Sequence, residues 1–406
     1  MPDESMTGEG TRSLRVSMLV WNTFLNDARV LNEARTLARA GYAVRVHALA
    51  LPGVTPAFET LEPGLSVQRC GGGQGRRQQG GGAGRFKGLA LLLLLCSRMF
   101  AMLQMGWAVI RARPQVVHAH DVNMLPLAWL AARLLRVPLV YDAHEISTGR
   151  EGYQSYRRVV AWLEKRIMPH AAGTITTTDA RAKFFARAYR IKRPVVLQNR
   201  PRHLQTVRSN RLRAELQLLD AWPIVIYQGG LQPGRGLARL VEAAASVPNA
   251  YFVFVGGGVL AQELRSLSES LDLTERVRFI NTVPLAELPS YTASADIGVQ
   301  PIENTCLNHF TTDSNKLFEY VQAGLPVVAS DLPEIRRVVR EHDLGLLVRA
   351  GDTGSLACAL RNLVGDSGLR KHHATRARTA AAVLNWEQQE HLLLGLYQRI
   401  LAEVRL

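Results

Sequence analysis

Short apolar runs alternate with segments of helical periodicity along most of the chain. The apolar runs predict strands. They lie at residues 15–21, 44–49, 116–120, 139–141, 173–178 and 195–197, and again at 224–227, 251–255, 277–280, 297–300 and 327–329. Between them, apolar residues three and four apart predict helices, as in the segment from Val30 to Ala38 that Gly41 closes. This alternation is typical of an α/β fold whose parallel sheets are covered on both faces.

A polar and basic stretch at residues 201–221 interrupts the alternation. The length of 406 residues also favours two domains, at about 150 residues per domain. We therefore predict two doubly wound, Rossmann-like domains at residues 14–200 and 222–385, joined by a linker at 201–221. Residues 386–406 are amphipathic and predict a terminal helix. Residues 1–13 are expected to be a disordered tail.

The first predicted domain places histidines and carboxylates after two of its strands. His120 ends the strand at 116–120, and His144 and Glu145 follow the strand at 139–141. Ligands of doubly wound sheets bind beyond the carboxyl ends of the strands, so we expect these side chains at the active-site edge. The loop after the first strand, with Asn26 and Asp27, faces that edge too, although Asp27 could instead cap the next helix.

His118 and His120 are two residues apart on one strand, so they share a face and could chelate a metal. Metal ligands usually form a tighter set, and we predict that no metal binds here. A structural role is the simpler interpretation of His118. For His144, a structural and a functional role both stay open.

In the second predicted domain, the glycine-rich segment QGGLQPGRG follows a strand and precedes a helix. Its glycines, Gly229 and Gly230 among them, allow the backbone to approach phosphates, and Arg235 can grip two phosphate oxygens. Taken alone, the segment could also be an ordinary tight turn. Gly256 and Gly257 follow the next strand and predict a second loop with room for sugar or phosphate. Thr282, one strand later, is predicted to face the base.

Residues 312–334 contain a third motif. Asp313 and Ser314 can cap a helix from Asn315 to Gln322, which Gly324 and Pro326 end. Asn315, Lys316 and Glu319 share the polar face at the start of this helix, where free N–H groups and the helix dipole attract a pyrophosphate. Lys316 adds a charge and Glu319 can accept from vicinal hydroxyls. The alternative is an exposed Lys316–Glu319 pair on a surface helix.

The sequence FEYVQAGLPVVASDLPEI, which begins at Phe318, resembles the donor-site signature of the GT-B glycosyltransferases of family 4, retaining enzymes that use nucleotide sugars. The resemblance implies a GT-B fold, with a terminal helix at 386–406 that crosses back to the first domain. It implies that Glu319 holds the donor ribose, that Arg235 and Lys316 hold the diphosphate, and that His120 contacts the transferred sugar. It also implies that no cofactor or metal is needed. Ser314 and Leu317 complete the implied donor-binding set, and the loop with Asp27 approaches the acceptor.

The sequence departs from that family pattern at two positions. The family pattern has two glutamates eight residues apart. Glu319 matches the second, but Thr311 stands at the position of the first, and Gly230 stands where the family usually has an arginine. Lys316 could supply the missing cation. The implied reaction is transfer of a hexose-type sugar from a nucleotide diphosphate sugar to a hydroxyl acceptor, a glycan or lipid-linked glycan, with retention. A nucleotide-sugar 2-epimerase of the same fold and a non-catalytic sugar- or lipid-binding relative remain alternatives.

Net charge and cysteine use add constraints on partners and location. The net charge of +15 predicts acidic partners, but the basic segments lack the interleaved aromatics of nucleic-acid-binding proteins, so nucleic acid is not expected. The four cysteines show no disulfide or metal spacing, and no secretory apolar segment opens the chain. We therefore expect a cytoplasmic protein.

The segment at 71–88 is basic and glycine-rich and is expected to be flexible. The apolar run after it is interrupted by Arg98 and Gln104, which favours a buried or interfacial helix over a membrane span. No acid occurs from Pro63 to His120. A basic loop beside an apolar helix predicts peripheral docking on the anionic inner face of the plasma membrane. A solvated loop with a core helix is the alternative.

Overall fold

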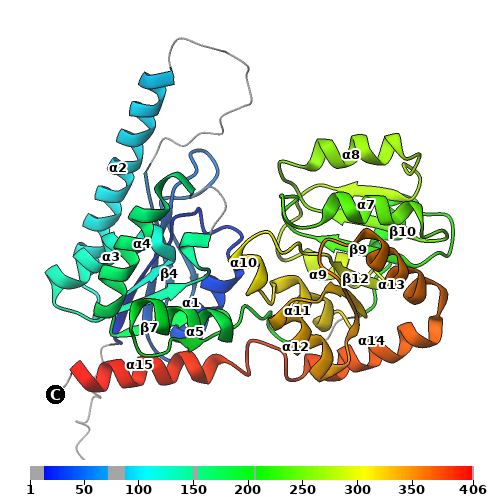
Figure 1. The fold of residues 1–406 in the computed structure, drawn as a ribbon. Helices are drawn as coiled ribbons and strands as arrows, with labels where there is room; N and C mark the ends of the chain where they lie inside the picture. The colour runs from blue at the N-terminus through cyan, green and yellow to red at the C-terminus, as the bar shows by residue number, and fades with distance from the viewer. Residues whose placement is uncertain (1–12, 72–86, 150–153, 205–206, 405–406) are drawn as a thin grey trace, which may run out of the picture. The chain divides into compact units, whose positions relative to one another are not determined.

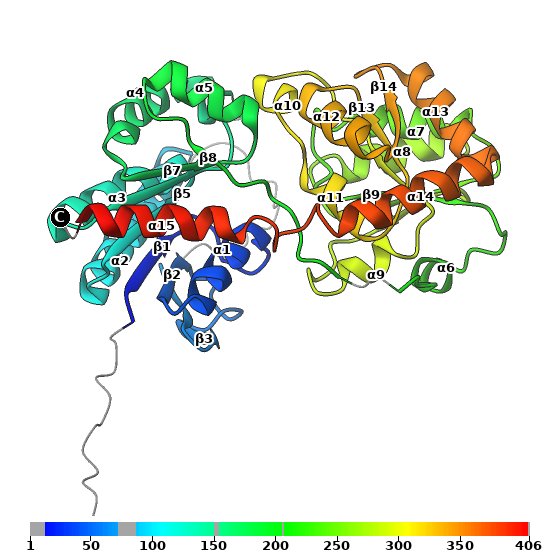
Figure 2. The ribbon, with the colours of Figure 1, turned by 90° about the horizontal axis from the view of Figure 1, so that it is seen from below.

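The computed structural model describes residues 13–71, 87–149, 154–204 and 207–404, and Figures 1 and 2 show it from two sides. The chain divides into two units. Unit 1 contains residues 1–143, 162–174 and 394–406, and unit 2 contains residues 144–161 and 175–393. Almost all of the predicted tail at 1–13 and of the predicted basic loop at 71–88 lies outside the described residues.

An eight-stranded sheet forms the body of unit 1, in the order β3-β4-β2-β1-β5-β6-β7-β8. Its strands are β1 (Arg15–Leu19), β2 (Ala43–Leu49), β3 (Phe58–Glu62), β4 (Leu65–Cys70), β5 (Val116–His120), β6 (Leu139–Ala143), β7 (Gly173–Thr176) and β8 (Val195–Val196). Strands β4, β2, β1, β5 and β6 run parallel, whereas β3 is antiparallel to β4. By its contacts, the edge from Ile175 onward belongs to unit 2. Strands β5 and β6 are buried along their whole length, as parallel strands covered on both faces are.

The helices of unit 1 are α1 (Ala28–Arg39), α2 (Lys87–Ala112), α3 (Asp121–Leu135), the second half of α4 (Arg157–Ile167) and most of α15 (Glu390–Val404). Helix α2 packs on β4, β2 and β1 and lies beside α3, while its first turns extend past the sheet (Figure 1). Helix α15 packs so closely on β7 that a Cβ at Gly173 would lie 2.6 Å from Ile400 Cδ1. None of the helices in the described part of the chain is long and apolar enough to cross a membrane.

A six-stranded parallel sheet forms unit 2, in the order β11-β10-β9-β12-β13-β14. Its strands are β9 (Ile224–Gln228), β10 (Tyr251–Val255), β11 (Val277–Ile280), β12 (Ile297–Gln300), β13 (Val327–Ser330) and β14 (Gly345–Val348). Its helices are α5 (Asp179–Tyr189), α6 (Arg211–Leu216), α7 (Leu237–Ala245), α8 (Ala261–Ser270), α9 (Leu288–Thr292), α10 (Leu307–Phe310), α11 (Asn315–Gln322), α12 (Pro333–His342), α13 (Thr353–Gly365) and α14 (Ser367–Ala381). Two apolar cores lie against the sheet. Helices α11, α12 and α14 contribute to one of them, and α7, α8 and α13 contribute to the other.

The predicted α/β class with parallel sheets is confirmed, and every predicted strand is present to within two residues at its ends. Three strands were not predicted: β3 and β4, in which polar residues interrupt the apolar ones, and the short β14. Helix α6 lies within the stretch that the sequence suggested as a linker.

Candidate functional site

Glu319 lies at the carboxyl edge of the unit 2 sheet, on the first turns of α11. Tyr320 fixes this helix, because its hydroxyl donates to the carbonyls of Ile226 and Val299 at 3.2 Å. Gln228, buried at the end of β9, donates from Nε2 to Glu319 Oε2 at 2.5 Å. Thr292 Oγ1 in turn donates to Gln228 Oε1 at 2.6 Å. One Glu319 carboxylate oxygen is thus fixed by a chain of hydrogen bonds, and the carboxylate is held in one orientation.

Two glycines make the wall against which Lys316 lies. Gly229, after β9, has a φ of +115°, and a Cβ there would lie 2.8 Å from Lys316 Cε and 3.0 Å from Nζ. Gly256, after β10, has a φ of +144°, and a Cβ there would lie 2.2 Å from the carbonyl oxygen of Gly229. Both conformations favour glycine. The glycines therefore let two loop backbones and the lysine meet in one place, as the sequence predicts for a phosphate-binding turn.

The positive charges of Lys316 and Arg235 act on each other. Lys316 Nζ lies 5.3 Å from the centre of the Tyr227 ring, which attracts it. Burial, and secondly the charge of Arg235, lower the pKa of Lys316 to about 8, while Glu319 acts to raise it. Burial also raises the pKa of Glu319, against the Gln228 hydrogen bond and the Lys316 charge. A half-buried ammonium whose neighbour is another cation is stabilised by an anion, and a diphosphate supplies one.

The remaining predicted donor residues lie around these groups. Gly257 approaches Thr282, whose Oγ1 would be 3.0 Å from a Cβ there. Asn315 is exposed at the first position of α11, whereas Leu317 is fully buried in the core, so its side chain is structural. The carbonyl of Gly230 accepts from the Tyr227 hydroxyl at 3.0 Å. No hydrogen bond or ion pair of Arg235 occurs among the described residues.

The predicted helix cap at Asp313 and Ser314 is wrong in its chemistry. Ser314 occupies the N-cap position, but its side chain makes no capping hydrogen bond within the described chain. Asp313 is buried and accepts from Gln198 Nε2 at 2.7 Å. The start of α11 therefore keeps N–H groups that no side chain of this pair occupies, as an anion site requires.

Unit 1 contains a buried ionic cluster that includes His120. We call it the histidine cluster, and its members are Arg29, Glu33, His118, His120 and Asp142. Arg29 donates twice to Asp142, from Nε at 2.7 Å and from a terminal nitrogen at 2.8 Å. His120 Nδ1 lies 3.3 Å from Asp142 Oδ2, and its ring stacks on His118 at 4.3 Å between centroids. The cluster fixes the orientation of the His120 ring at the end of β5.

Contacts with α15 and α1 explain two other sequence interpretations. His118 is fully buried, and its Nδ1 lies 3.0 Å from the Tyr397 hydroxyl of α15, which agrees with the structural role favoured for it. Asp27 is the N-cap of α1 and accepts from the Val30 N–H at 3.1 Å, so the capping alternative is confirmed. Asn26 is exposed beside it in the same loop.

Glu33, His118, His120 and Asp142 could together offer four metal-ligand atoms within 4.8 Å of one another. Arg29 lies against both carboxylates, since its Nε is also 3.3 Å from Glu33 Oε1. Burial alone would lower the pKa of Arg29, but Asp142 and Glu33 raise it, so the guanidinium stays charged. The Arg29 guanidinium already supplies the positive charge that these two carboxylates need, so the cluster fits a metal ion poorly.

In unit 2, Arg181 joins the residues around Thr311, the position where the related family has its first glutamate. Arg181 Nε donates to Thr311 Oγ1 at 3.2 Å, and a terminal nitrogen of Arg181 donates to the His144 carbonyl at 2.6 Å. Asn308 donates to Glu145 Oε2 at 3.3 Å. Thr311 is buried, so its hydroxyl serves this network. The sequence contains no signal for Arg181 or Asn308, because neither lies in a recognisable motif.

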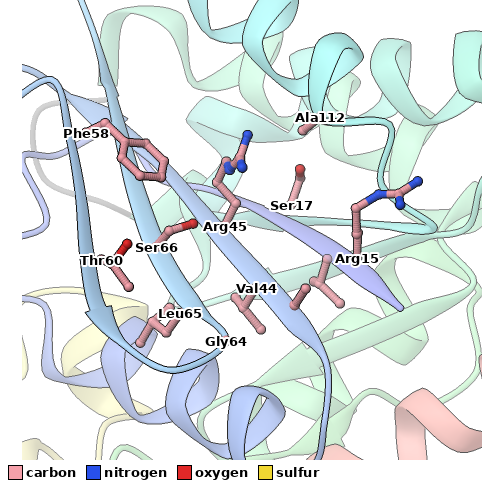
Figure 3. A pocket seen from close by; sticks show the side chains of 12 residues that line it. Arg15, Ser17, Val44, Arg45, Phe58, Thr60, Gly64, Leu65, Ser66 and Ala112 are labelled. Atoms are coloured by element: carbon pink, nitrogen blue, oxygen red, sulfur yellow. The ribbon is translucent and has the colours of Figure 1, made fainter. Parts of the chain in front are cut away.

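A separate pocket of about 280 Å³ lies at the amino ends of β1, β2 and β4 (Figure 3). Its lining residues include Arg15, Ser17, Arg45, Phe58 and Ser66, which Figure 3 labels. None of the predicted site residues lines it. Ligands of parallel α/β sheets bind at the opposite, carboxyl edge, so we give this pocket no part in the candidate site.

Two Rossmann-like sheets, each with chemistry-bearing residues at its carboxyl edge, are the layout of a GT-B glycosyltransferase, an enzyme that transfers sugars. Residues 27–201 match the family described as "Glycosyl transferase 4-like domain", and residues 222–366 match "Glycosyl transferases group 1". The chain belongs to this family of glycosyltransferases.

Individual relatives agree with that assignment. D-inositol 3-phosphate glycosyltransferase of Nocardia farcinica is 26% identical over 400 residues, which cover 92% of this chain and 84% of the relative. Sucrose-phosphate synthase from Thermosynechococcus elongatus has the same fold, with a TM-score of 0.77, 20% identity and coverage of 96% and 100%. So does the Anabaena protein HepE in complex with UDP-glucose, with a TM-score of 0.67, 18% identity and coverage of 97% and 99%.

Proposed function

We propose that this enzyme transfers a hexose-type sugar from a nucleoside diphosphate sugar to a hydroxyl acceptor with retention of anomeric configuration. The observation that carries the proposal is the placement of Lys316 against the Gly229 turn, with Nζ 3.0 Å from where a Cβ of Gly229 would lie. Burial, and secondly the charge of Arg235, lower the pKa of this lysine to about 8. These two cations are suited to two linked phosphates. Lys316 thereby supplies the positive charge that the family usually has from an arginine at the position of Gly230.

Each remaining group has a role that follows from its chemistry. Glu319, oriented by Gln228, accepts hydrogen bonds from the two ribose hydroxyls of the donor. As the sugar–phosphate bond breaks, negative charge grows on the diphosphate, and Lys316 and Arg235 stabilise it. The acceptor attacks from the face that the diphosphate leaves and gives its proton to the departing phosphate. His120, held by Asp142, contacts the transferred sugar.

The donor class has support from relatives of known structure, because HepE, which shares this fold, was solved with UDP-glucose. The relative from Nocardia is named for an inositol phosphate, a compound with several hydroxyl groups. We propose a glycan or lipid-linked glycan as the acceptor here, used at the cytoplasmic face of the plasma membrane. We propose no cofactor or metal, since cationic side chains perform the charge stabilisation and Arg29 neutralises the carboxylates of the histidine cluster.

Removal of the Glu319 carboxylate tests the proposal. Glu319→Ala should abolish sugar transfer yet cost only about 1 kcal/mol of stability, because it leaves Gln228 with one hydrogen bond fewer. Glu341→Ala, which removes an exposed carboxylate from α12, is the matched control and should retain activity. Thermal-shift screening with UDP, GDP, TDP, ADP and CMP first identifies the nucleotide, because a bound ligand raises the melting temperature.

Product analysis then measures transfer for each variant. Wild-type turnover in Glu319→Ala would contradict the role of the carboxylate. Conversion of the donor sugar without any acceptor would instead favour the 2-epimerase alternative.

A further inference from the structure

Helix α2 exposes large apolar side chains along much of its length. Leu93, Leu95, Met99 and Phe100, in the turns that extend past the sheet, are each more than half exposed (Figure 1). From Ala101 onward the helix packs on the sheet with one face, but Leu103 and Trp107 point outward, 67% and 62% exposed. Phe100, Leu103 and Trp107 are three and four residues apart, so they form one stripe. This stripe has no apolar cover within the described part of the chain.

Helix α3 continues the same surface. Gly106 of α2 meets Leu127 of α3, where a Cβ on the glycine would lie 3.1 Å from Leu127 Cδ1. Both helices cover the same face of the sheet, so their outward side chains lie on one side of unit 1 (Figure 1). Leu130 and Leu134 are the outward residues of α3 and are half or more exposed. We call Phe100, Leu103, Trp107, Leu130 and Leu134 the apolar face.

Eight of the 24 exposed large apolar residues in the described chain lie on these two helices, which is a concentration that isolated surface residues do not produce. The charge around them is of one sign. From residue 63 to residue 141, Asp121 at the start of α3 is the sole acid. Arg98, Arg111 and Arg133 are exposed on α2 and α3. An apolar stripe rimmed by arginines and almost free of acids matches an anionic lipid surface.

We infer that the apolar face of α2 and α3 docks this enzyme on an anionic lipid bilayer, with Leu103 and Trp107 inserted among the lipids and Arg111 and Arg133 on the headgroup phosphates. Tryptophan suits this depth, since its ring is amphipathic. Charge selects the bilayer over a second copy of the chain, because two copies would bring arginine rims together without acids to pair them. The inference rests on the membrane location proposed above but not on the transfer chemistry, so nucleotide binding is a separate readout.

A fluorophore on Cys96 tests the docking directly, because this thiol is exposed on α2. The environment-sensitive probe NBD is attached to the full chain in a Cys306→Ser, Cys358→Ser background. The control carries NBD on Cys358 of α13, which is also exposed, in a Cys96→Ser, Cys306→Ser background. With vesicles of phosphatidylcholine and phosphatidylglycerol, emission of the Cys96 probe should rise about twofold or more, and that of the control should not. An equal response of both probes, or none, overturns the proposal.

The apolar contribution is measured by co-sedimentation with the same vesicles. Leu103→Gln combined with Trp107→Gln should lower vesicle affinity about tenfold or more, because two inserted side chains are lost. Leu219→Gln combined with Val383→Gln changes two exposed apolar residues of unit 2 and should leave affinity unchanged. Both double variants should bind the nucleoside diphosphate as wild type does. Equal vesicle binding by the two double variants overturns the proposal.

The charge contribution is separated by a second pair of variants. Arg111→Gln with Arg133→Gln should weaken binding to anionic vesicles about fivefold per arginine, and high salt should remove the difference. Arg340→Gln with Arg361→Gln removes two exposed arginines of unit 2 and should have no effect. If instead the Cys96 probe responds to protein concentration without vesicles, the face joins two copies of the chain, and the bilayer inference is wrong.

Discussion

The ammonium group of Lys316 lies against the Tyr227 ring, and its neighbours act on its charge in opposite directions. Burial and Arg235 favour the neutral amine, whereas Glu319 favours the charged form. A diphosphate beside Lys316 would raise its pKa again, because a nearby anion stabilises the cation. Binding of the donor is therefore coupled to uptake of a proton.

This coupling predicts a pH dependence that belongs to Lys316. Below pH 8 the free protein already carries the charge, and above pH 8 the charge must be restored when the ligand binds. Affinity for the nucleoside diphosphate should therefore fall about tenfold between pH 7 and pH 9. Isothermal titration calorimetry on wild type and on Lys316→Arg measures it, since an arginine stays charged over this range. The same slope in both proteins would show that another group titrates.

At the scale of elements, the site depends on the close approach of the loops after β9 and β10. Gly256 has both a positive φ and the Gly229 carbonyl 2.2 Å from where a Cβ would be, and that carbonyl belongs to the backbone and cannot rotate away. Gly351 also has a positive φ, of +80°, but nothing within 4 Å of its Cβ position. A comparison of alanine substitutions at the two positions therefore separates the cost of backbone strain from the cost of steric collision.

Gly256→Ala should therefore destabilise the protein by more than about 3 kcal/mol and weaken nucleotide binding, because strain and collision add. Gly351→Ala should cost about 1 kcal/mol and leave nucleotide binding intact. Urea unfolding followed by calorimetry on each variant measures both quantities. Equal stability losses would mean that the loops can move apart without harm to the site.

Local sequence signals predicted α11 to the residue, because apolar periodicity, Gly324 and Pro326 all act within one short segment. They predicted Lys316 and Glu319 beside each other for the same reason. They could not predict that Gln228 orients Glu319 or that Arg181 donates a hydrogen bond to Thr311. The two residues of each pair are 91 and 130 residues apart in the chain. The predicted helix cap at Asp313 was wrong for the same reason, because its carboxylate accepts a hydrogen bond from Gln198, which is 115 residues away in the chain.

At the scale of the whole molecule, the fold class followed from the regular alternation of strands and helices, and the enzyme class followed from one local signature. Strand β3 escaped prediction because its edge position leaves it largely exposed, and its neighbour β4 escaped because polar residues alternate with its buried apolar ones. The histidine cluster could be only half predicted. His118 and His120 are neighbours in sequence, but Arg29 and Asp142 meet across 113 residues, which only the sheet order of unit 1 brings together.

The central claim, that Lys316 and Arg235 form the diphosphate site of a sugar-nucleotide enzyme, is tested most directly by the ratio of nucleoside diphosphate to nucleoside monophosphate affinity. Calorimetry on wild type, Lys316→Met and Arg235→Met measures this ratio, and Lys183→Met, which removes an exposed lysine of α5, is the control. Each site variant should lose about tenfold or more in diphosphate affinity and much less in monophosphate affinity. Equal losses for the two ligands, or none, would contradict the assignment of these cations to the second phosphate.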